Sequence, residues 1–362
     1  MNFFIPHMKK IFNSKLICFC AAGMLSLAVQ AGNNDRAGQA GANEILINPW
    51  ARSSGMAGAN SAYCKGLEAQ FLNVAGTAFT KKTEMLFVRT NMYSGSGIHL
   101  NSFGFTQKAG ETGALSLGLM SMDFGDIPIT TTELPEGGLG NFHPQYINLG
   151  LSYAKGFSDN SYGGITLKGI SEAISNLHTR GIALDAGIQY VTGPYDNVHF
   201  GIALKNVGPK MRYAGDGVSK RATPINASTS LSMDQRVSEF ELPSLVNVGG
   251  AYDMYFAKDS LSMKNHRVTL AANFTSNTYS NDEFKVGLEY AFRNMLMLRA
   301  GYNYEKGITT ATERTTIFTG PTAGFTLEVP FGKNKSSLGL DYSYRHTDPF
   351  QGVHSVGVRM NL

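Results

Sequence analysis

Apolar side chains alternate with small or polar ones in segment after segment, from Glu84 to the end of the chain. In the segment 284–292 (FKVGLEYAF), one set of alternate positions holds Phe, Val, Leu, Tyr and Phe, and the other holds Lys, Gly, Glu and Ala. A period of two is typical of a strand with one apolar and one polar face. No helical pattern elsewhere could cover so many apolar faces, so the cover we expect is lipid.

The alternation predicts fourteen strands, an even number like that of bacterial barrels formed by one chain. The predicted strands are residues 84–94, 97–107, 113–123, 145–156, 161–171, 180–192, 196–206, 243–256, 264–276, 283–292, 295–305, 317–329, 336–346 and 352–362. The predicted fold class is therefore all-β, a transmembrane antiparallel β-barrel of about fourteen strands.

The connections between these strands support a barrel that is entered from the periplasm. Short turns, such as 193–195 and 293–294, follow even-numbered strands, whereas the long loops 124–144, 207–242 and 306–316 follow odd-numbered ones. Outer-membrane barrels have short periplasmic turns and longer external loops. A soluble β-sandwich, which alternation alone would also allow, gives no reason for loops to sort in this way.

The first residues predict export. Three lysines precede a mostly apolar stretch, 16–29, and the small residue Ala31 follows it closely, so residues 1–31 are expected to be a secretory signal peptide. No later run reaches the roughly 18 apolar residues of a transmembrane helix. Residues 32–82 are richer in Gly and Asn, and we expect them to form a periplasmic or hatch segment that plugs the barrel of residues 83–362.

Composition and motifs argue against several function classes. Removal of the signal lysines lowers the formal charge from +4 to about +1, which leaves no basic excess for nucleic acid. Cys64 is the only cysteine beyond the signal, so we expect no internal disulfide. Serine-hydrolase, zinc-protease and phosphate-loop motifs are absent, and the histidines are dispersed. We therefore expect neither an enzyme nor a bound cofactor; a barrel lipase or protease would need a clustered nucleophile, base and orienting group.

Charged residues on the strands fall on the polar phase, which should face the lumen, because a lipid-facing charge at mid-bilayer costs about 2–4 kcal/mol. These residues are Lys168, Asp185, Lys205, Arg267, Lys285, Glu289, Arg299, Asp341 and Arg359. Their mixed signs favour mutual neutralisation in a closed, partly filled interior over an ion pathway.

The segment 47–60 is the least barrel-like part of the chain and carries its only tryptophan. It contains Pro49, Trp50, Ala51, Arg52, Gly55, Met56 and Gly58, and an Asn-x-Ala-Gly pattern follows at Asn73. These motifs, together with the later segments 164–168, 183–190, 201–209 and 242–244, resemble the PorV/PorQ family, whose members are related to the FadL-type fatty-acid channels. The resemblance covers residues 49–362.

The resemblance implies an outer-membrane component of the type IX secretion system of Bacteroidetes. Its partners would be the translocon barrel, cargo proteins with C-terminal secretion domains, and sortase-like subunits that attach cargo to the cell surface. The expected partner-binding residues lie in the two longest loops: Phe124, Ile127, Ile129, Leu134, Met211 and Tyr213. For Phe124, Ile127, Ile129 and Leu134, packing over the barrel mouth is an equal alternative. The alternative function is a FadL-like channel for the uptake of hydrophobic small molecules, which predicts an apolar lumen pocket and a lateral gap in the wall.

Overall fold

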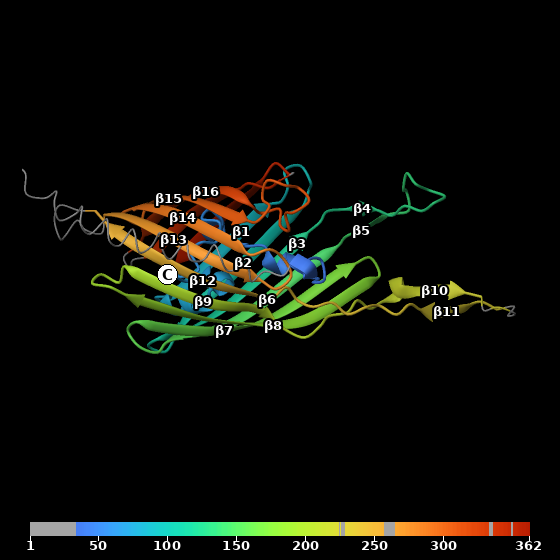
Figure 1. Cartoon of the computed structure of the whole chain (residues 1–362), viewed down its shortest axis with the longest axis horizontal. Coiled ribbons are helices and arrows are strands. Elements are labelled where there is room, and N and C mark those ends of the chain that lie inside the picture. The colour runs from blue at the N-terminus through green and yellow to red at the C-terminus, as the bar shows by residue number, and fades with distance from the viewer. Residues whose placement is uncertain (1–33, 224, 226–228, 257–264, 333–335, 349) are drawn as a thin grey trace, which may run out of the picture.

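The computed structural model describes residues 34–362, apart from residues 224, 226–228, 257–264, 333–335 and 349. The expected signal peptide and its cleavage near Ala31 lie outside the described residues. Fourteen strands close into one barrel, and each strand runs antiparallel to both of its neighbours (Figure 1). The predicted fold class is confirmed.

The barrel strands match the predicted ones to within a few residues at each end. In chain order they are β1 (Thr83–Asn91), β2 (His99–Ala109), β3 (Gly113–Asp123), β6 (Gln145–Gly156), β7 (Ser161–Ile174), β8 (Leu177–Thr192), β9 (Val198–Val207), β12 (Leu245–Tyr255), β13 (His266–Asn277), β14 (Glu283–Phe292), β15 (Leu296–Glu305), β16 (Gly320–Phe331), β17 (Ser336–Arg345) and β18 (Val353–Asn361). The barrel closes where β1 pairs with β18 along its whole length.

The outer surface of the barrel is apolar, and its polar side chains point inward. In β6, for example, Leu151 is 56% exposed, whereas its neighbour Ser152 is 2% exposed. The same inversion holds for the segment 284–292, where Val286 and Leu288 are exposed and Glu289 is buried. A soluble protein would place these side chains the other way round. The exposed band is therefore the surface that meets lipid.

Long loops leave one end of the barrel, here named the loop end, and two short hairpins project from it (Figure 1). The hairpins are β4 (Ile127–Pro128) with β5 (Asn141–Phe142), and β10 (Ser219–Ala222) with β11 (Leu231–Asp234). The opposite end, the turn end, holds the start of β1 and the end of the chain, where the Leu362 amide donates to the Thr83 carbonyl at 2.9 Å.

One connection at the loop end is shorter than we expected. The predicted strands 161–171 and 180–192 leave eight residues between them, but β7 and β8 continue until only Ser175 and Asn176 remain. Ser175 takes a positive φ of 51°, which allows a tight two-residue turn. The strand pair therefore extends further than its alternation pattern indicated.

Residues 34–82, here named the N-terminal segment, lie inside the barrel (Figure 1). Their short helices are η2 (Asn34–Arg36), η3 (Asn43–Leu46), α2 (Ala51–Ser54), α3 (Ala69–Leu72) and η4 (Val74–Phe79). Of these helices, α3 is a single turn of four residues. No helix among the described residues is long and apolar enough to cross a membrane.

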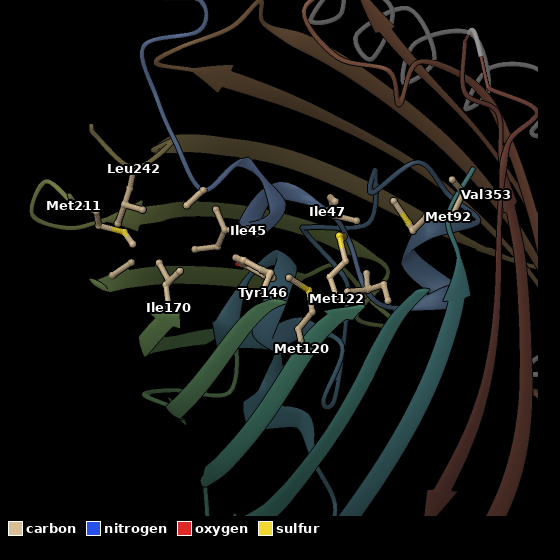
Figure 2. Packing of buried hydrophobic residues seen from close by; sticks show 13 residues of the cluster. Ile45, Ile47, Met92, Met120, Met122, Tyr146, Ile170, Met211, Leu242 and Val353 are labelled. Atoms are coloured by element: carbon tan, nitrogen blue, oxygen red, sulfur yellow. The ribbon is translucent and has the colours of Figure 1, made fainter. Parts of the chain in front are cut away.

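Near the loop end, the N-terminal segment packs against the barrel through a methionine-rich cluster, here named the outer cluster (Figure 2). Ile45 and Ile47 of the segment meet Met120 and Met122 of β3 and Tyr146 of β6. The remaining buried members are Ala42, Met92, Leu100, Ile170, Ala183, Met211, Leu242 and Val353. The part of the lumen between η3, β3 and β6 is therefore apolar toward the loop end.

A charge on the lipid-facing band should be costly only at mid-membrane. Leu167, which lies in the middle of β7 and is 50% exposed, is the test position, and Tyr190, near the turn end of β8 and 44% exposed, is its control. We expect Leu167→Arg to lower the free energy of unfolding by about 2–4 kcal/mol and Tyr190→Arg by about 0–1 kcal/mol. Denaturant titrations in lipid vesicles measure both, and equal losses would contradict a membrane-spanning barrel.

Candidate functional site in the barrel lumen

A belt of alternating charges runs along one wall of the lumen. Glu289 of β14 is bound by Arg267 of β13 at 2.5 Å and by Arg299 of β15 at 2.6 Å. Arg299 also donates to the Thr326 hydroxyl of β16 at 2.7 Å, and that hydroxyl donates to Asp341 of β17 at 2.5 Å. The belt is therefore continuous over five neighbouring strands.

Arg359 of β18 joins this belt to the N-terminal segment. Its guanidinium lies 2.9 Å from the Asp341 carboxylate, 2.7 Å from that of Glu68 and 3.6 Å from that of Glu84. Glu84 in turn accepts a hydrogen bond from the Leu67 amide at 2.9 Å. With Arg52 of the segment, the cations Arg267, Arg299 and Arg359 balance the carboxylates of Glu68, Glu84, Glu289 and Asp341. The formal charges of the belt therefore cancel.

The first part of the predicted motif packs against the strands near this belt. Trp50 and Ala51 are buried against Leu67, Leu86 and Val88. Pro49 lines a small cavity beside β3 and β6. The Arg52 guanidinium lies 3.4 Å from the Met297 sulfur of β15. These side chains face the barrel wall and one another, so their contacts hold the segment in place.

The glycines of the motif allow the segment to touch strand backbones. A Cβ atom at Gly55 would lie 3.1 Å from the Cα of Gly324 in β16. Gly58 takes a positive φ of 74°, a conformation that favours glycine. Met56 is fully buried and lies against Gly287 of β14. Small residues on both surfaces therefore permit the close approach.

Asn73 both caps a helix and fixes the segment to the wall. Its side-chain oxygen accepts from the Ala75 amide at 3.3 Å, at the start of η4. Its amide nitrogen donates to the Ile188 carbonyl of β8 at 3.0 Å. The turn that carries Val74 thus begins with a side-chain cap.

The opposite wall contacts the segment through uncharged groups. Gln70 of α3 donates to the Ser152 hydroxyl of β6 at 2.7 Å and to the Gly150 carbonyl at 3.0 Å. Ser152 bonds Thr166 of β7 at 2.9 Å, and Ser116 of β3 donates to Thr106 of β2 at 2.8 Å. We name these four side chains, of Thr106, Ser116, Ser152 and Thr166, the hydroxyl wall.

Two lysines that we expected in the lumen are buried but differ in their partners. Lys168 of β7 forms an ion pair with Asp185 of β8 at 2.5 Å. Lys205 of β9 is 4% exposed, and among the described residues its ammonium has no ion pair. It lies 3.7 Å from the centre of the Phe71 ring, a cation–π contact.

A cavity of about 670 Å³ lies between the N-terminal segment and the loop end. One side is apolar and belongs to the outer cluster and its neighbours: Leu46, Ile47, Tyr93, Ile98, Met122, Phe124 and Phe318. The other side is polar and holds Lys205, Ser244, Asn247, Thr275 and Lys285. Among the described residues, no group of three or more His, Cys, Asp or Glu could hold a metal ion.

The residues predicted to bind a partner separate into two groups. Ile127, Ile129 and Leu134 are 37%, 38% and 48% exposed, in or beside the β4–β5 hairpin. Phe124 instead packs against the outer cluster and lines the cavity.

Met211 does not fit the same prediction, and Tyr213 is only partly exposed. Met211 is only 2% exposed, because it fills the outer cluster against Gly181. Tyr213 is half-buried, and its hydroxyl donates to Glu172 of β7 at 2.6 Å. Met211 therefore packs over the barrel mouth and is not available to a partner, whereas Tyr213 stays partly exposed.

At the loop end, charges hold the start of the N-terminal segment to the loops. Glu241 lies 3.3 Å from Lys210 and 3.2 Å from Arg36, and it also accepts from the Tyr279 hydroxyl. The hydrogen bond from Lys210, assisted by Arg36, lowers the pKa of Glu241. The segment is thus fastened here and again at Glu68.

Sequence reasoning missed Glu68, Gln70 and Phe71. They lie in a short apolar stretch without strand alternation, and a single helical turn has no periodic signal. The available signal was the presence of Glu68 and Gln70 among apolar residues. Buried polar side chains need hydrogen-bond partners, so these two residues could have been predicted to bind the barrel wall.

The fold and the apolar outer surface define an outer-membrane type of β-barrel whose lumen holds its own N-terminal segment. Among solved structures, the Pseudomonas putida toluene transporter TodX is similar, with a TM-score of 0.51 and 13% identity over 87% of this chain and 97% of that one. The CymD monoaromatic hydrocarbon channel is similar with the same TM-score, identity and coverage. At these identities the likeness shows a shared fold.

A Pseudomonas aeruginosa FadL homologue also matches, with a TM-score of 0.46 and 15% identity over 86% of this chain and 96% of that one. No protein-family model and no curated protein matches the sequence. The finer resemblance to PorV/PorQ therefore stays a hypothesis.

Removal of the Arg359 side chain tests the charged belt. Arg359→Met leaves the carboxylates of Glu68, Glu84 and Asp341 buried without their shared cation, so we expect it to lower the free energy of unfolding by about 3–5 kcal/mol. Adding Asp341→Asn removes one stranded charge and should restore part of that loss. Denaturant titration of the three proteins measures both effects, and a double variant less stable than the single one would contradict this account.

Proposed function

We propose that the protein is an outer-membrane barrel of a Gram-negative bacterium that takes up a small hydrophobic molecule through its lumen. The observation that carries the proposal is the cavity at the loop end, with one apolar side. Its volume lies within the roughly 300–1,000 Å³ of known small-molecule sites. The two similar structures are named as a toluene transporter and a hydrocarbon channel, which supports this class of ligand.

The barrel wall bears on the route of such a molecule. Every barrel strand is hydrogen-bonded to both neighbours, and the one shift in register, between Leu184 and Ala186 of β8, leaves β8 paired with β9. The pairing between β8 and β9 begins only at Leu184, although β8 itself begins at Leu177. The proposal routes the molecule through the lumen, past the N-terminal segment. It needs no catalytic residue and no cofactor.

Uptake of radiolabelled toluene by cells that express the barrel tests this proposal. Ile98→Asp places a carboxylate on the apolar side of the cavity, and Ile129→Asp is its matched control on an exposed hairpin. We expect wild type and the Ile129→Asp variant to raise uptake equally and Ile98→Asp to abolish most of the rise. Uptake no faster than in cells without the barrel would contradict the proposal.

A second function, a role in type IX secretion, is favoured by the exposed side chains of the projecting hairpins. Leu134 and Leu139 are 48% and 50% exposed in the β4–β5 connection, and Leu231 and Met233 of β11 are each 55% exposed. Such side chains beyond the lipid-facing wall are typical of protein-binding surfaces. With the PorV/PorQ resemblance, they support binding of the translocon barrel, of cargo with C-terminal secretion domains, and of surface-attachment subunits.

Purification of the tagged barrel from native outer membranes in mild detergent tests the second function. The secretion role predicts that translocon, cargo or attachment subunits accompany the barrel, as identified by mass spectrometry. The Leu134→Asp variant should be purified without these subunits, whereas the Ile98→Asp variant, which is altered within the cavity, should still be purified with them. If the barrel comes alone from membranes that contain those subunits, this role is contradicted.

A further inference from the structure

Phe71 stands between two cavities in the lumen. It lines the cavity of about 670 Å³ at the loop end, and it also lines a smaller one of about 40 Å³ beside β3, β6 and β7. The smaller cavity is also bordered by Met120, Asn148, Gly150 and Lys168. The Phe71 ring is therefore the side chain that the two cavities share.

Gln70, the residue that precedes Phe71, also lines the small cavity. Its side-chain nitrogen bonds Ser152 and the Gly150 carbonyl at 2.7 and 3.0 Å, and it lies 3.5 Å from the Ser116 carbonyl. The hydroxyl wall continues from there toward the turn end, through Thr106 and Thr80 at 3.3 Å. Both obstructions thus come from the single turn α3.

The rest of the lumen offers a less favourable route for a small apolar molecule. Along β13 to β18 the wall carries the charged belt, and the ion pair between Glu68 and Arg359 of β18 binds the N-terminal segment to it. Separating such a buried ion pair costs several kcal/mol. Against the hydroxyl wall the contacts are neutral hydrogen bonds, each with a net contribution of about 0.5–1.5 kcal/mol. Lys168 is the charged residue at the small cavity, and Asp185 neutralises it.

We propose that Phe71 and Gln70 form a two-residue gate, and that the route through the lumen follows β3, β6 and β7 past this gate. This inference rests on the proposed uptake function. Rotation of two side chains of α3 would join the cavities while the belt stays intact. Lys205 is a positioning residue, because its ammonium holds the Phe71 ring in the closed arrangement.

The chain contains a matched control for the gate. Lys65 lies over the Phe79 ring at 4.8 Å, the same kind of contact in the same N-terminal segment. Phe79, however, packs against Tyr162 near the start of β7 and lines neither of the two cavities. Phe79→Ala therefore removes an equivalent aromatic contact without joining the cavities.

Labelling of single cysteines in intact cells tests the gate. Each reporter cysteine is introduced into a Cys64→Ser background. Asn148→Cys reports on the small cavity, and Ser244→Cys reports on the cavity of about 670 Å³ at the loop end. Thr326→Cys reports on the charged belt. A membrane-impermeant sulfonated thiol reagent is added from outside. We expect it to label Ser244→Cys readily and to label Asn148→Cys and Thr326→Cys poorly.

Phe71→Ala should speed the labelling of Asn148→Cys about tenfold or more, a factor equivalent to about 1.4 kcal/mol. Lys205→Met should speed it less, Phe79→Ala should leave it unchanged, and Thr326→Cys should stay unlabelled throughout. If Asn148→Cys stays protected in Phe71→Ala while Ser244→Cys is labelled, the gate is overturned; equal labelling of Thr326→Cys overturns the route. Labelling needs no transported ligand, so a failed toluene uptake with positive labelling would refute the proposed function alone.

Discussion

Contact of the outer face with lipid is the constraint from which the rest of this structure follows. Each strand presents a continuous apolar face outward, so its polar and charged side chains must be accommodated in the lumen. Buried charges are tolerable only when they are paired and hydrogen-bonded. The belt from Arg267 to Glu84 meets this requirement through its ion pairs. Glu68 and Arg52 of the N-terminal segment contribute one charge of each sign to it. Folding of the segment and closure of the barrel are therefore linked.

The two walls of the lumen hold the N-terminal segment with different strength. On the charged side, Arg359 joins Glu68 to carboxylates from two strands. On the hydroxyl side, Gln70 and Asn73 bond chiefly to neutral oxygens. A segment held in this unequal way can stay anchored while part of it moves, and such local motion is drawn from the less stable contacts of a protein. This asymmetry is the physical basis for a passage along β3, β6 and β7.

The sequence predicted the barrel closely because alternation is repeated in every strand and a slip of one residue would expose its whole polar face to lipid. The lumen-facing charges followed from the same phase. The ion-pair partners of these charges could not be predicted from the alternation. The partners of Glu289 on β13 and β15, for example, depend on the register between neighbouring strands. The turn between β7 and β8 was missed, since a positive φ at Ser175 has no clear sequence signal.

The candidate site was less predictable than the fold. The motif around Trp50 and Gly55 marked the N-terminal segment, but the segment's path through the lumen depends on close approach to glycines of distant strands, such as Gly324. Met211 was expected on an exposed loop, yet it is buried, because an apolar side chain in a long loop can fold back over the barrel mouth. Phe71 and Lys205 lie far apart in sequence, and only the closed barrel brings them together.

Native mass spectrometry of the barrel, released from its own outer membrane without added ligand, tests the central claim most directly. A barrel with a ligand cavity at its loop end should retain one small apolar molecule per chain, and Ile98→Asp should release it. A wild-type barrel that carries no small molecule, but is found with protein partners, would contradict the uptake function and leave the secretion role in its place.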